Sequence, residues 1–533
     1  MAIVKEISGE ILQDKILIHM SGQINSENVP AVGDAIRNIV SQRPDLPVEL
    51  DTKDLTDISS AGLRLILSLR KTNPDIRITG VNSEIYEILD MTGFTQMMTV
   101  TKAYKVVSIE GAEEIGRGAN GTIYRIDSDK VVKVYNCATA LDDIQYEREV
   151  ARKALILGLP TAISYDVVRV GDSYGSVFEL LNATSFSKII IREPEKIDWC
   201  VKEYTDLLKL IHSTVVPKGE LPDIRNTAIS WAEFLQDHLP EKAGKKLLVL
   251  VKAVPQDDHM IHGDYHTKNV QLVGNEVLMI DMDTISVGHP IFELGSMYNA
   301  FVGYSEYDHE AIKQFQGFDY STGKIFWKKA LAAYLGTQNE KKIRDVENKA
   351  RIIGYSRLIR RSIRRKGLES ENGRAEIELW KSELLDLLER TDSLLFVPNE
   401  IKVEAKTENL AKVSGFIEAH LKNTECRPSA KMQIHLAVEE IFVNIASYAY
   451  YPGTGDTIVR VEVQDDPLTI VIEFIDRGRP FDPLAKDNPD VTLSAEERKI
   501  GGLGIFLTRK MMDQIDYQYK DGKNILTLKK TLS

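Results

Sequence analysis

Two separated sets of residues have the types and spacing that phosphate chemistry requires. In the first, a glycine-rich turn precedes a lysine on a predicted strand, so backbone amides and an ammonium group can reach phosphates. Further along, carboxylates and an amide in one loop can bind Mg²⁺ and orient a hydroxyl nucleophile. The residues of this set are Gly116, Gly118, Gly121, Lys133, Glu149, Asp264, Asn269 and Asp281. Glu149, on the next predicted helix, is expected to pair with Lys133 and hold it in place.

The second set combines one helix face, a strand end and a helix opened by glycines. Its residues are Glu440, Asn444, Asp476, Gly478, Gly502 and Gly504. The first pair is spaced i, i+4 and therefore lies on one helix face. The glycines present backbone amides at a positive helix end, which favours phosphate. Each feature alone fits an ordinary solvated stripe or turn, but the three in this order predict a nucleotide site.

A candidate phosphate acceptor precedes both sets. The segment DISSAGLR, residues 57–64, joins a predicted strand to a predicted helix, so Ser59 or Ser60 lies at the start of that helix. Serine is a good helix cap, which is a sufficient explanation from composition alone. The same position also favours a phosphate, because backbone N–H groups point toward it.

The elements around these residues predict an α/β multidomain protein. Residues 1–105 alternate strands with helices, which indicates a sheet covered by helices. Residues 106–395 begin with a small β lobe and continue as a larger helical lobe. Residues 396–533 contain a long helix, alternating strands and the glycine-opened helix, which indicates an α/β sandwich.

Composition limits the classes of function. The length of 533 residues predicts several domains, and the formal charge of -12 argues against general binding to nucleic acid or an anionic membrane. The basic run RLIRRSIRRK, residues 357–366, is interpreted as a solvated helix face, because no aromatic residues are interleaved with it. No apolar run has the length of a membrane span, no secretory signal is recognised and the few cysteines are widely spaced, so we expect a cytoplasmic protein.

The first segment resembles the STAS fold of anti-sigma factor antagonists. DISSAGLR is similar to the phosphorylation loop of that family, and its place after a strand agrees. The resemblance implies Ser60 as the phosphoacceptor. Many members have Asp immediately before that serine, where this sequence has Ser59, which leaves Ser59 as a second candidate.

The first nucleotide set resembles the aminoglycoside phosphotransferase and choline kinase branch of the protein-kinase-like fold, which implies a bilobal α+β domain. The motifs HGDYHTKN (262–269) and IDMD (280–283) carry the resemblance. It implies that Lys133 and Glu149 position phosphates, with Glu147 as the alternative partner. It also implies Asp264 as the catalytic base and Asn269 and Asp281 as metal ligands. A decayed pseudokinase is the competing interpretation.

The second set resembles the Bergerat-fold (GHKL) ATP site, in its anti-sigma serine kinase branch. The motifs are EIFVN (440–444), DRG (476–478) and GGLG (501–504). The resemblance implies that Asn444 coordinates Mg²⁺ and that Asp476 reads the adenine amino group. Glu440 would act near the transferred phosphate, and Gly502 and Gly504 would hinge a lid formed by residues 483–500.

These resemblances together predict an ATP- and Mg²⁺-dependent phosphotransferase in a bacterial partner-switching pathway. The leading hypothesis is that the C-terminal domain phosphorylates a STAS serine, either Ser60 or one on a partner protein of the STAS, anti-sigma or sigma type. A second hypothesis assigns the chemistry to the middle domain, acting on a small-molecule or protein hydroxyl. A third is an ATP-gated scaffold without catalysis. A homodimer is compatible with all three.

Overall fold

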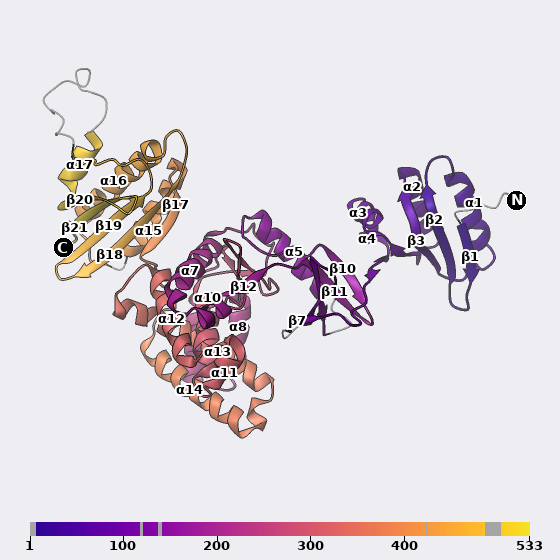
Figure 1. Ribbon diagram of the computed structural model, residues 1–533, viewed down its shortest axis with the longest axis horizontal. Coiled ribbons are helices and arrows are strands. Elements are labelled where there is room, and N and C mark those ends of the chain that lie inside the picture. Colours follow the sequence, from indigo (N-terminus) through magenta and orange to yellow (C-terminus); the bar gives the residue numbers. More distant parts are fainter. Residues whose placement is uncertain (1–6, 118–120, 137–140, 423, 486–502) are drawn as a thin grey trace, which may run out of the picture. The chain divides into compact units, whose positions relative to one another are not determined.

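The computed structural model describes residues 7–117, 121–136, 141–422, 424–485 and 503–533. The chain forms two compact units, the first made of Met1–Glu149 and Ala162–Leu181 and the second of Val150–Thr161 and Asn182–Ser533. Figure 1 follows the chain through both units by colour. Within the described ranges, no helix has the length and apolar character that crossing a membrane requires.

The N-terminal part is one sheet with helices packed on it. Strand β1 is antiparallel to β2, whereas β2, β3, β4 and β5 run parallel in that order. The elements are β1 (Ile7–Ile11), β2 (Ile16–Ile24), α1 (Val29–Val40), β3 (Val48–Ile58), α2 (Ser60–Thr72), β4 (Arg77–Val81), α3 (Ser83–Met91), α4 (Phe94–Met97) and β5 (Val100–Lys102). Alternate residues of β2 are buried and join α1, α2 and α3 in one apolar core, as the period of a half-buried strand predicts.

The next sheet contains the glycine-rich hairpin. Its strand order is β6-β10-β11-β9-β8-β7, and β6 pairs parallel with β10. The strands are β6 (Lys105–Val106), β7 (Glu114–Arg117), β8 (Gly121–Arg125), β9 (Lys130–Tyr135), β10 (Asp166–Val170) and β11 (Ser173–Glu179). A Cβ at Gly121 would lie 2.4 Å from the Val134 carbonyl oxygen on β9, so only glycine allows this close strand contact. Helix α5 (Leu141–Ile156) follows β9.

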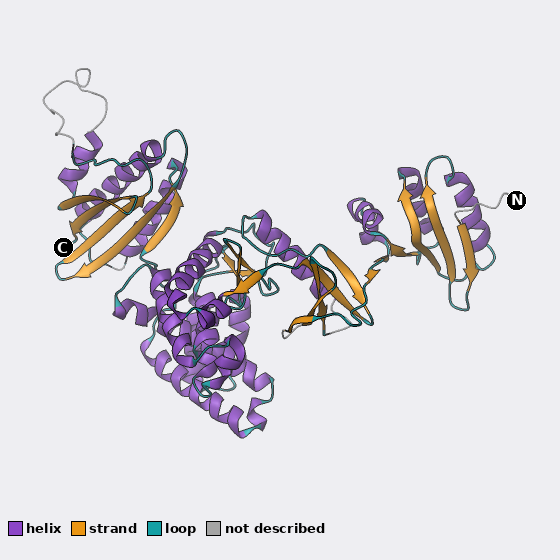
Figure 2. Cartoon of the chain, in the orientation of Figure 1, coloured by secondary structure: helices purple, strands orange, loops and turns teal. Residues whose placement is uncertain are grey.

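The second unit begins with a mostly helical region, coloured purple in Figure 2. Its short strands are β12 (Ala183–Ser185), β13 (Met260–Ile261), β14 (Val270–Val273), β15 (Glu276–Met279) and β16 (Ser286–Val287). Its helices are α6 (Phe186–Arg192), α7 (Ile197–Ser213), α8 (Ile224–Leu235), α9 (Glu241–Ala253), α10 (Ile291–Phe301), α11 (Glu310–Gln316), α12 (Tyr320–Leu335), α13 (Glu340–Arg364) and α14 (Glu371–Arg390). Helix α10 is buried almost throughout, so residues at its start can anchor neighbouring loops.

The C-terminal part is an antiparallel sheet in the order β17-β18-β19-β21-β20. Its elements are β17 (Glu400–Glu404), α15 (Leu410–Leu421), α16 (Pro428–Asn444), a π-helical turn at Ile445–Ala449, β18 (Asp456–Asp465), β19 (Leu468–Asp476), α17 (Leu503–Met511), β20 (Gln514–Lys520) and β21 (Lys523–Thr531). Apolar side chains of α15 and α16 share one core with β18, β19 and β21. This layer of helices on a sheet agrees with the predicted α/β sandwich.

Candidate functional site

The two serines of the acceptor segment have different environments. Ser59 is the N-cap of α2, and its hydroxyl accepts a hydrogen bond from the Gly62 N–H at 3.4 Å. Ser60 is the first residue of the helix and is exposed. Ser59 therefore performs the capping function, and Ser60 presents its hydroxyl to solvent at the positive end of the helix.

Lys133 on β9 is held by a carboxylate of α5, but the partner is Glu147. The Lys133 Nζ lies 3.0 Å from Glu147 Oε1, and the Tyr135 hydroxyl donates to Glu147 Oε2 at 2.6 Å. Burial raises the pKa of Tyr135, and the nearby Lys133 charge opposes that shift. Glu149, which the sequence favoured, is exposed, so that choice was wrong. Residues i and i+2 of a helix point to different faces, and only one of the two can meet the sheet.

Removing the Glu147 charge should destabilise the β lobe. Glu147→Gln removes the carboxylate that pairs with the half-buried Lys133 ammonium, and we expect a loss of roughly 1.5–3 kcal/mol. Glu149→Gln is the matched control, with an expected change within about 0.5 kcal/mol because the side chain is exposed. Urea unfolding, together with amide exchange of β8 and β9, measures both variants. Equal losses in the two would contradict the assignment.

The HGDYHTKN loop, residues 262–269, places a half-buried carboxylate beside a histidine side chain. The Asp264 Oδ2 lies 3.4 Å from His266 Nε2. Burial raises the pKa of Asp264, but the His266 hydrogen bond and the charges of His266, Arg357 and His262 together lower it to about 2. Asp264 is therefore an ionised acceptor at neutral pH, as a base for a hydroxyl proton must be.

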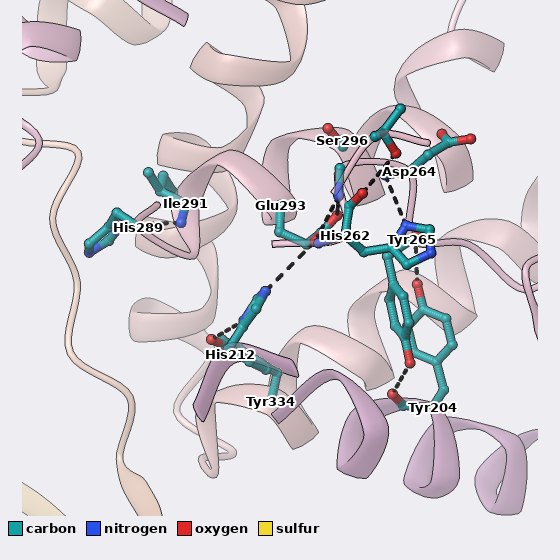
Figure 3. A network of polar contacts seen from close by, with 12 residues as sticks. Tyr204, His212, His262, Asp264, Tyr265, His289, Ile291, Glu293, Ser296 and Tyr334 are labelled. Atoms are coloured by element: carbon teal, nitrogen blue, oxygen red, sulfur yellow. Dashed lines mark hydrogen bonds and ion pairs between the residues drawn. The ribbon is translucent and has the colours of Figure 1, made fainter. Parts of the chain in front are cut away.

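A fully buried glutamate of α10 accepts hydrogen bonds from the backbone of this loop (Figure 3). The Glu293 carboxylate accepts the His262 N–H at 2.6 Å and the Gly263 N–H at 3.1 Å. His212 Nε2 lies 3.9 Å from the same carboxylate, and His212 Nδ1 shares a hydrogen bond with the Tyr334 hydroxyl. Burial raises the pKa of Glu293, whereas the neighbouring His212 and His262 side chains and the Gly263 N–H lower it, and the net direction is downward.

Two further contacts fix the backbone on either side of Asp264. Arg357 of α13 donates to the Gly263 carbonyl at 3.0 Å. The Tyr204 and Tyr265 hydroxyls each donate to the other residue's carbonyl at 2.8 Å. Gly263 has φ +83, and a Cβ there would lie 2.6 Å from the Thr284 carbonyl oxygen, so the turn before Asp264 requires glycine.

The predicted metal ligands of this loop have suitable donor atoms. Asn269 Nδ2 donates to the Asp264 carbonyl at 3.0 Å, which leaves its amide oxygen as the ligand atom. Asp281 has a left-handed backbone, φ 64, which is uncommon for a residue with a Cβ and frequent at functional sites. His262 Nε2 approaches the Ile280 carbonyl at 3.3 Å, so the HGDYHTKN and IDMD segments are in contact. An amide and a carboxylate oxygen fit the preference of Mg²⁺ for oxygen ligands.

In the C-terminal domain, one helix face meets the start of another helix. Asn444 Nδ2 donates to Glu440 Oε1 at 2.8 Å, as the i, i+4 spacing predicts. A Cβ at Gly504 would lie 1.6 Å from Glu440 Oε1. The first turn of α17 therefore lies against the Glu440 carboxylate, which would have to move to admit any larger residue at position 504.

Asp476, at the end of β19, is buried and asymmetrically hydrogen-bonded. Its Oδ1 accepts the Gly478 N–H at 2.8 Å and Asn524 Nδ2 at 2.9 Å. The Oδ2 has no partner among the described residues. Burial raises the pKa of Asp476, while the Asn524 and Gly478 hydrogen bonds lower it. The free oxygen can accept a hydrogen bond from an exocyclic amino group. A Cβ at Gly478 would lie 2.5 Å from the Ala449 carbonyl oxygen, which explains the glycine in this turn.

Asn524 contacts the candidate site at Asp476, and the sequence analysis did not identify it. It is paired with Asp476 across the β19–β21 ladder, and its Oδ1 accepts the Tyr517 hydroxyl at 2.7 Å. No spacing in the sequence connects residues this far apart. Some predicted positions are not tested at all: Gly118, Gly502 and most of the lid, residues 486–500, lie outside the described residues.

Comparison with known families finds one family for each part of the chain. The STAS domain matches residues 2–107, the phosphotransferase enzyme family matches residues 111–326, and the histidine kinase-like ATPase domain matches residues 403–530. The protein is thus a fusion of these domains in the predicted order.

Curated relatives identify the kinase family. The serine/threonine-protein kinase BtrW of Bordetella bronchiseptica is 30% identical over 104 residues, which cover 19% of this chain and 72% of the relative. The chain belongs to this serine kinase family. The serine-protein kinase RsbW of Bacillus cereus is a second relative, 26% identical over 134 residues, or 24% of this chain and 82% of the relative. This serine kinase is therefore an enzyme that uses ATP, and it carries a second phosphotransferase domain.

Solved structures with a similar course of the backbone include two phosphotransferases. The aminoglycoside phosphotransferase APH(2'')-Ib is 15% identical with a TM-score of 0.38, covering 57% of this serine kinase and 99% of the other chain. A choline/ethanolamine kinase family protein from Mesorhizobium loti is 13% identical with a TM-score of 0.36, covering 52% and 88%.

Proposed function

We propose that the C-terminal domain transfers the γ-phosphate of ATP to Ser60 of a STAS domain, in this chain or in a second copy. The observation that carries the proposal is the difference between two serines at the start of α2: Ser59 caps the helix, and Ser60 is exposed. The serine-kinase relatives and the ATPase-family match at residues 403–530 support a serine as acceptor.

In this proposal each residue of the C-terminal site has one role. Asp476 Oδ2 accepts the adenine amino group, and Asn524 keeps the carboxylate oriented. Glu440 takes the proton from the serine hydroxyl as its oxygen bonds to the γ-phosphorus and ADP departs. Asn444 would hold Mg²⁺, which neutralises phosphate charge when bound. Its hydrogen bond to Glu440 aligns the two side chains.

The phosphate would act as a switch through charge. A phosphoserine adds about -1.5 to -2 charges at neutral pH. At the first residue of α2 this charge is favoured by the helix dipole but alters the surface that a partner meets. We infer that the partner is another STAS-type or anti-sigma-type regulator, and that a homodimer would allow transfer between chains.

The middle domain is a second candidate for catalysis. The ionised Asp264, the aligned Asn269 and the Lys133–Glu147 pair are the groups that phosphoryl transfer to a hydroxyl needs. In this role Asp264 is the base, Asn269 and Asp281 would hold Mg²⁺, and Lys133 would contact phosphates, assisted by the backbone of Gly116 and Gly121.

Phosphopeptide mass spectrometry after incubation with Mg-ATP separates the two candidates. We expect phosphate on Ser60 in the wild-type chain and in Asp264→Ala, and none in Glu440→Ala or Ser60→Ala. Ser59→Ala is the control for the cap: it weakens α2 by about 1 kcal/mol but leaves Ser60 available. If phosphate on Ser60 disappears only in Asp264→Ala, the reaction is catalysed by the middle domain. No phosphate on Ser60 in the wild type refutes transfer to this STAS domain.

A further inference from the structure

The end of α13 carries a run of arginines next to the HGDYHTKN loop. These are Arg357, Arg360, Arg361, Arg364 and Arg365. Arg357 donates to the Gly263 carbonyl at 3.0 Å and to Ser296 Oγ at 2.5 Å. This arginine is half-buried, and so are Arg360 and Arg361. The interpretation of the run as a solvated helix face is therefore wrong for these three positions.

Arg361 lies one turn beyond Arg357 and within electrostatic reach of Asp264. Burial and the Arg365 charge lower the pKa of Arg361, while the Asp264 carboxylate raises it. The Arg361 guanidinium also lies 5.2 Å from the centre of the Tyr304 ring, which limits its freedom. Arg360 and Arg364 repel each other in the same way as Arg361 and Arg365. Burial and the Arg364 charge both lower the pKa of Arg360.

The Asp264 carboxylate acts electrostatically on Arg357 and Arg361 but forms no ion pair with either of them among the described residues. In the part of the chain that the structure describes, none of the five arginines forms an ion pair with an acidic side chain. The first half of the same helix differs, since Lys349 pairs with Asp345 at 2.6 Å and Arg351 with Glu383 at 2.5 Å. Crowded, partly buried cations without ion-pair partners are costly, and a bound anion would lower that cost.

We infer that the acceptor of the middle domain is a phosphate-bearing molecule, whose hydroxyl reaches Asp264 while its phosphate is bound by Arg361 and Arg365. Guanidinium groups bind phosphate with paired, charge-assisted hydrogen bonds. The same charges would repel an amine-bearing acceptor. The inference rests on the proposed role of Asp264, but its test measures binding rather than turnover, so failure of one does not imply failure of the other.

Three hexoses with common hydroxyl groups provide the test: glucose 6-phosphate, glucose and glucosamine. Their affinities for the full chain are measured by saturation-transfer NMR in saturating Mg-AMP-PNP, so that the nucleotide sites are filled. We expect glucose 6-phosphate to bind at least about tenfold more tightly than glucosamine, with glucose between them. Arg361→Gln should weaken the binding of glucose 6-phosphate by roughly tenfold, and Arg361→Lys should weaken it by less.

Two further variants distinguish a loss of phosphate binding from a loss of folding. Arg365→Gln changes an exposed side chain and should still weaken glucose 6-phosphate. Arg344→Gln, an exposed arginine at the other end of α13, is the matched control and should have no effect. No preference for the phosphate sugar overturns the inference, as does unchanged binding in both Arg361→Gln and Arg365→Gln. If these variants lose AMP-PNP binding but keep the same sugar preference, the arginines bind ATP rather than the acceptor. That result also overturns the inference.

Discussion

Asp264→Asn is expected to lower phosphate transfer by the middle domain by roughly 10²–10⁴-fold, the contribution typical of a positioned general base. The amide is nearly isosteric, but it cannot take the hydroxyl proton. Transfer from labelled ATP is measured in the Glu440→Ala background, so that the C-terminal domain does not contribute. Asp258→Asn, an exposed aspartate shortly before the loop, is the control and should retain activity. A rate unchanged by Asp264→Asn would indicate a pseudokinase.

The lowered pKa of Asp264 also determines the sign of one pH effect. The folded-state value of about 2 lies below the ordinary aspartate value, so the ionised form stabilises the fold above that ordinary value. This contribution is lost as the pH falls toward about 2. An activity decrease of the wild-type chain at mildly acidic pH must therefore come from another group.

Glu293→Ala is expected to cause the largest loss of stability, about 3–5 kcal/mol. The substitution removes a fully buried carboxylate and leaves the N–H groups of His262 and Gly263 without acceptors. Glu293→Gln retains one acceptor oxygen and should lose less. Denaturant unfolding followed by circular dichroism measures both variants.

A second readout links this stability loss to the loop. Amide exchange at His262 and Gly263 should accelerate in Glu293→Ala more than exchange in β18 and β19 of the C-terminal sheet. Equal stability of Glu293→Ala and the wild type would show that the loop is held by Arg357 and the tyrosine pair alone.

Local patterns were sufficient to predict the three domains and some contacts within single elements. The alternation in β2 and the i, i+4 pair Glu440–Asn444 are properties of a single element, whose geometry follows from the sequence period. The glycine-rich hairpin and the strand before Asp476 were predictable for the same reason. Motif order then added the family resemblances, which the domain matches confirmed.

Other features depended on contacts between elements far apart in the chain. Glu147 rather than Glu149 holds Lys133 because only the rotation of α5 against the sheet determines which carboxylate is buried. Asn524 supports Asp476 because the register of β19 and β21 places them opposite each other. Glu293 and Arg357 reach the HGDYHTKN loop because α10 and α13 pack around it. The sequence by itself determined the domains and the chemical groups, whereas tertiary packing decided which partner each charged group has, since burial and distance control electrostatic interactions.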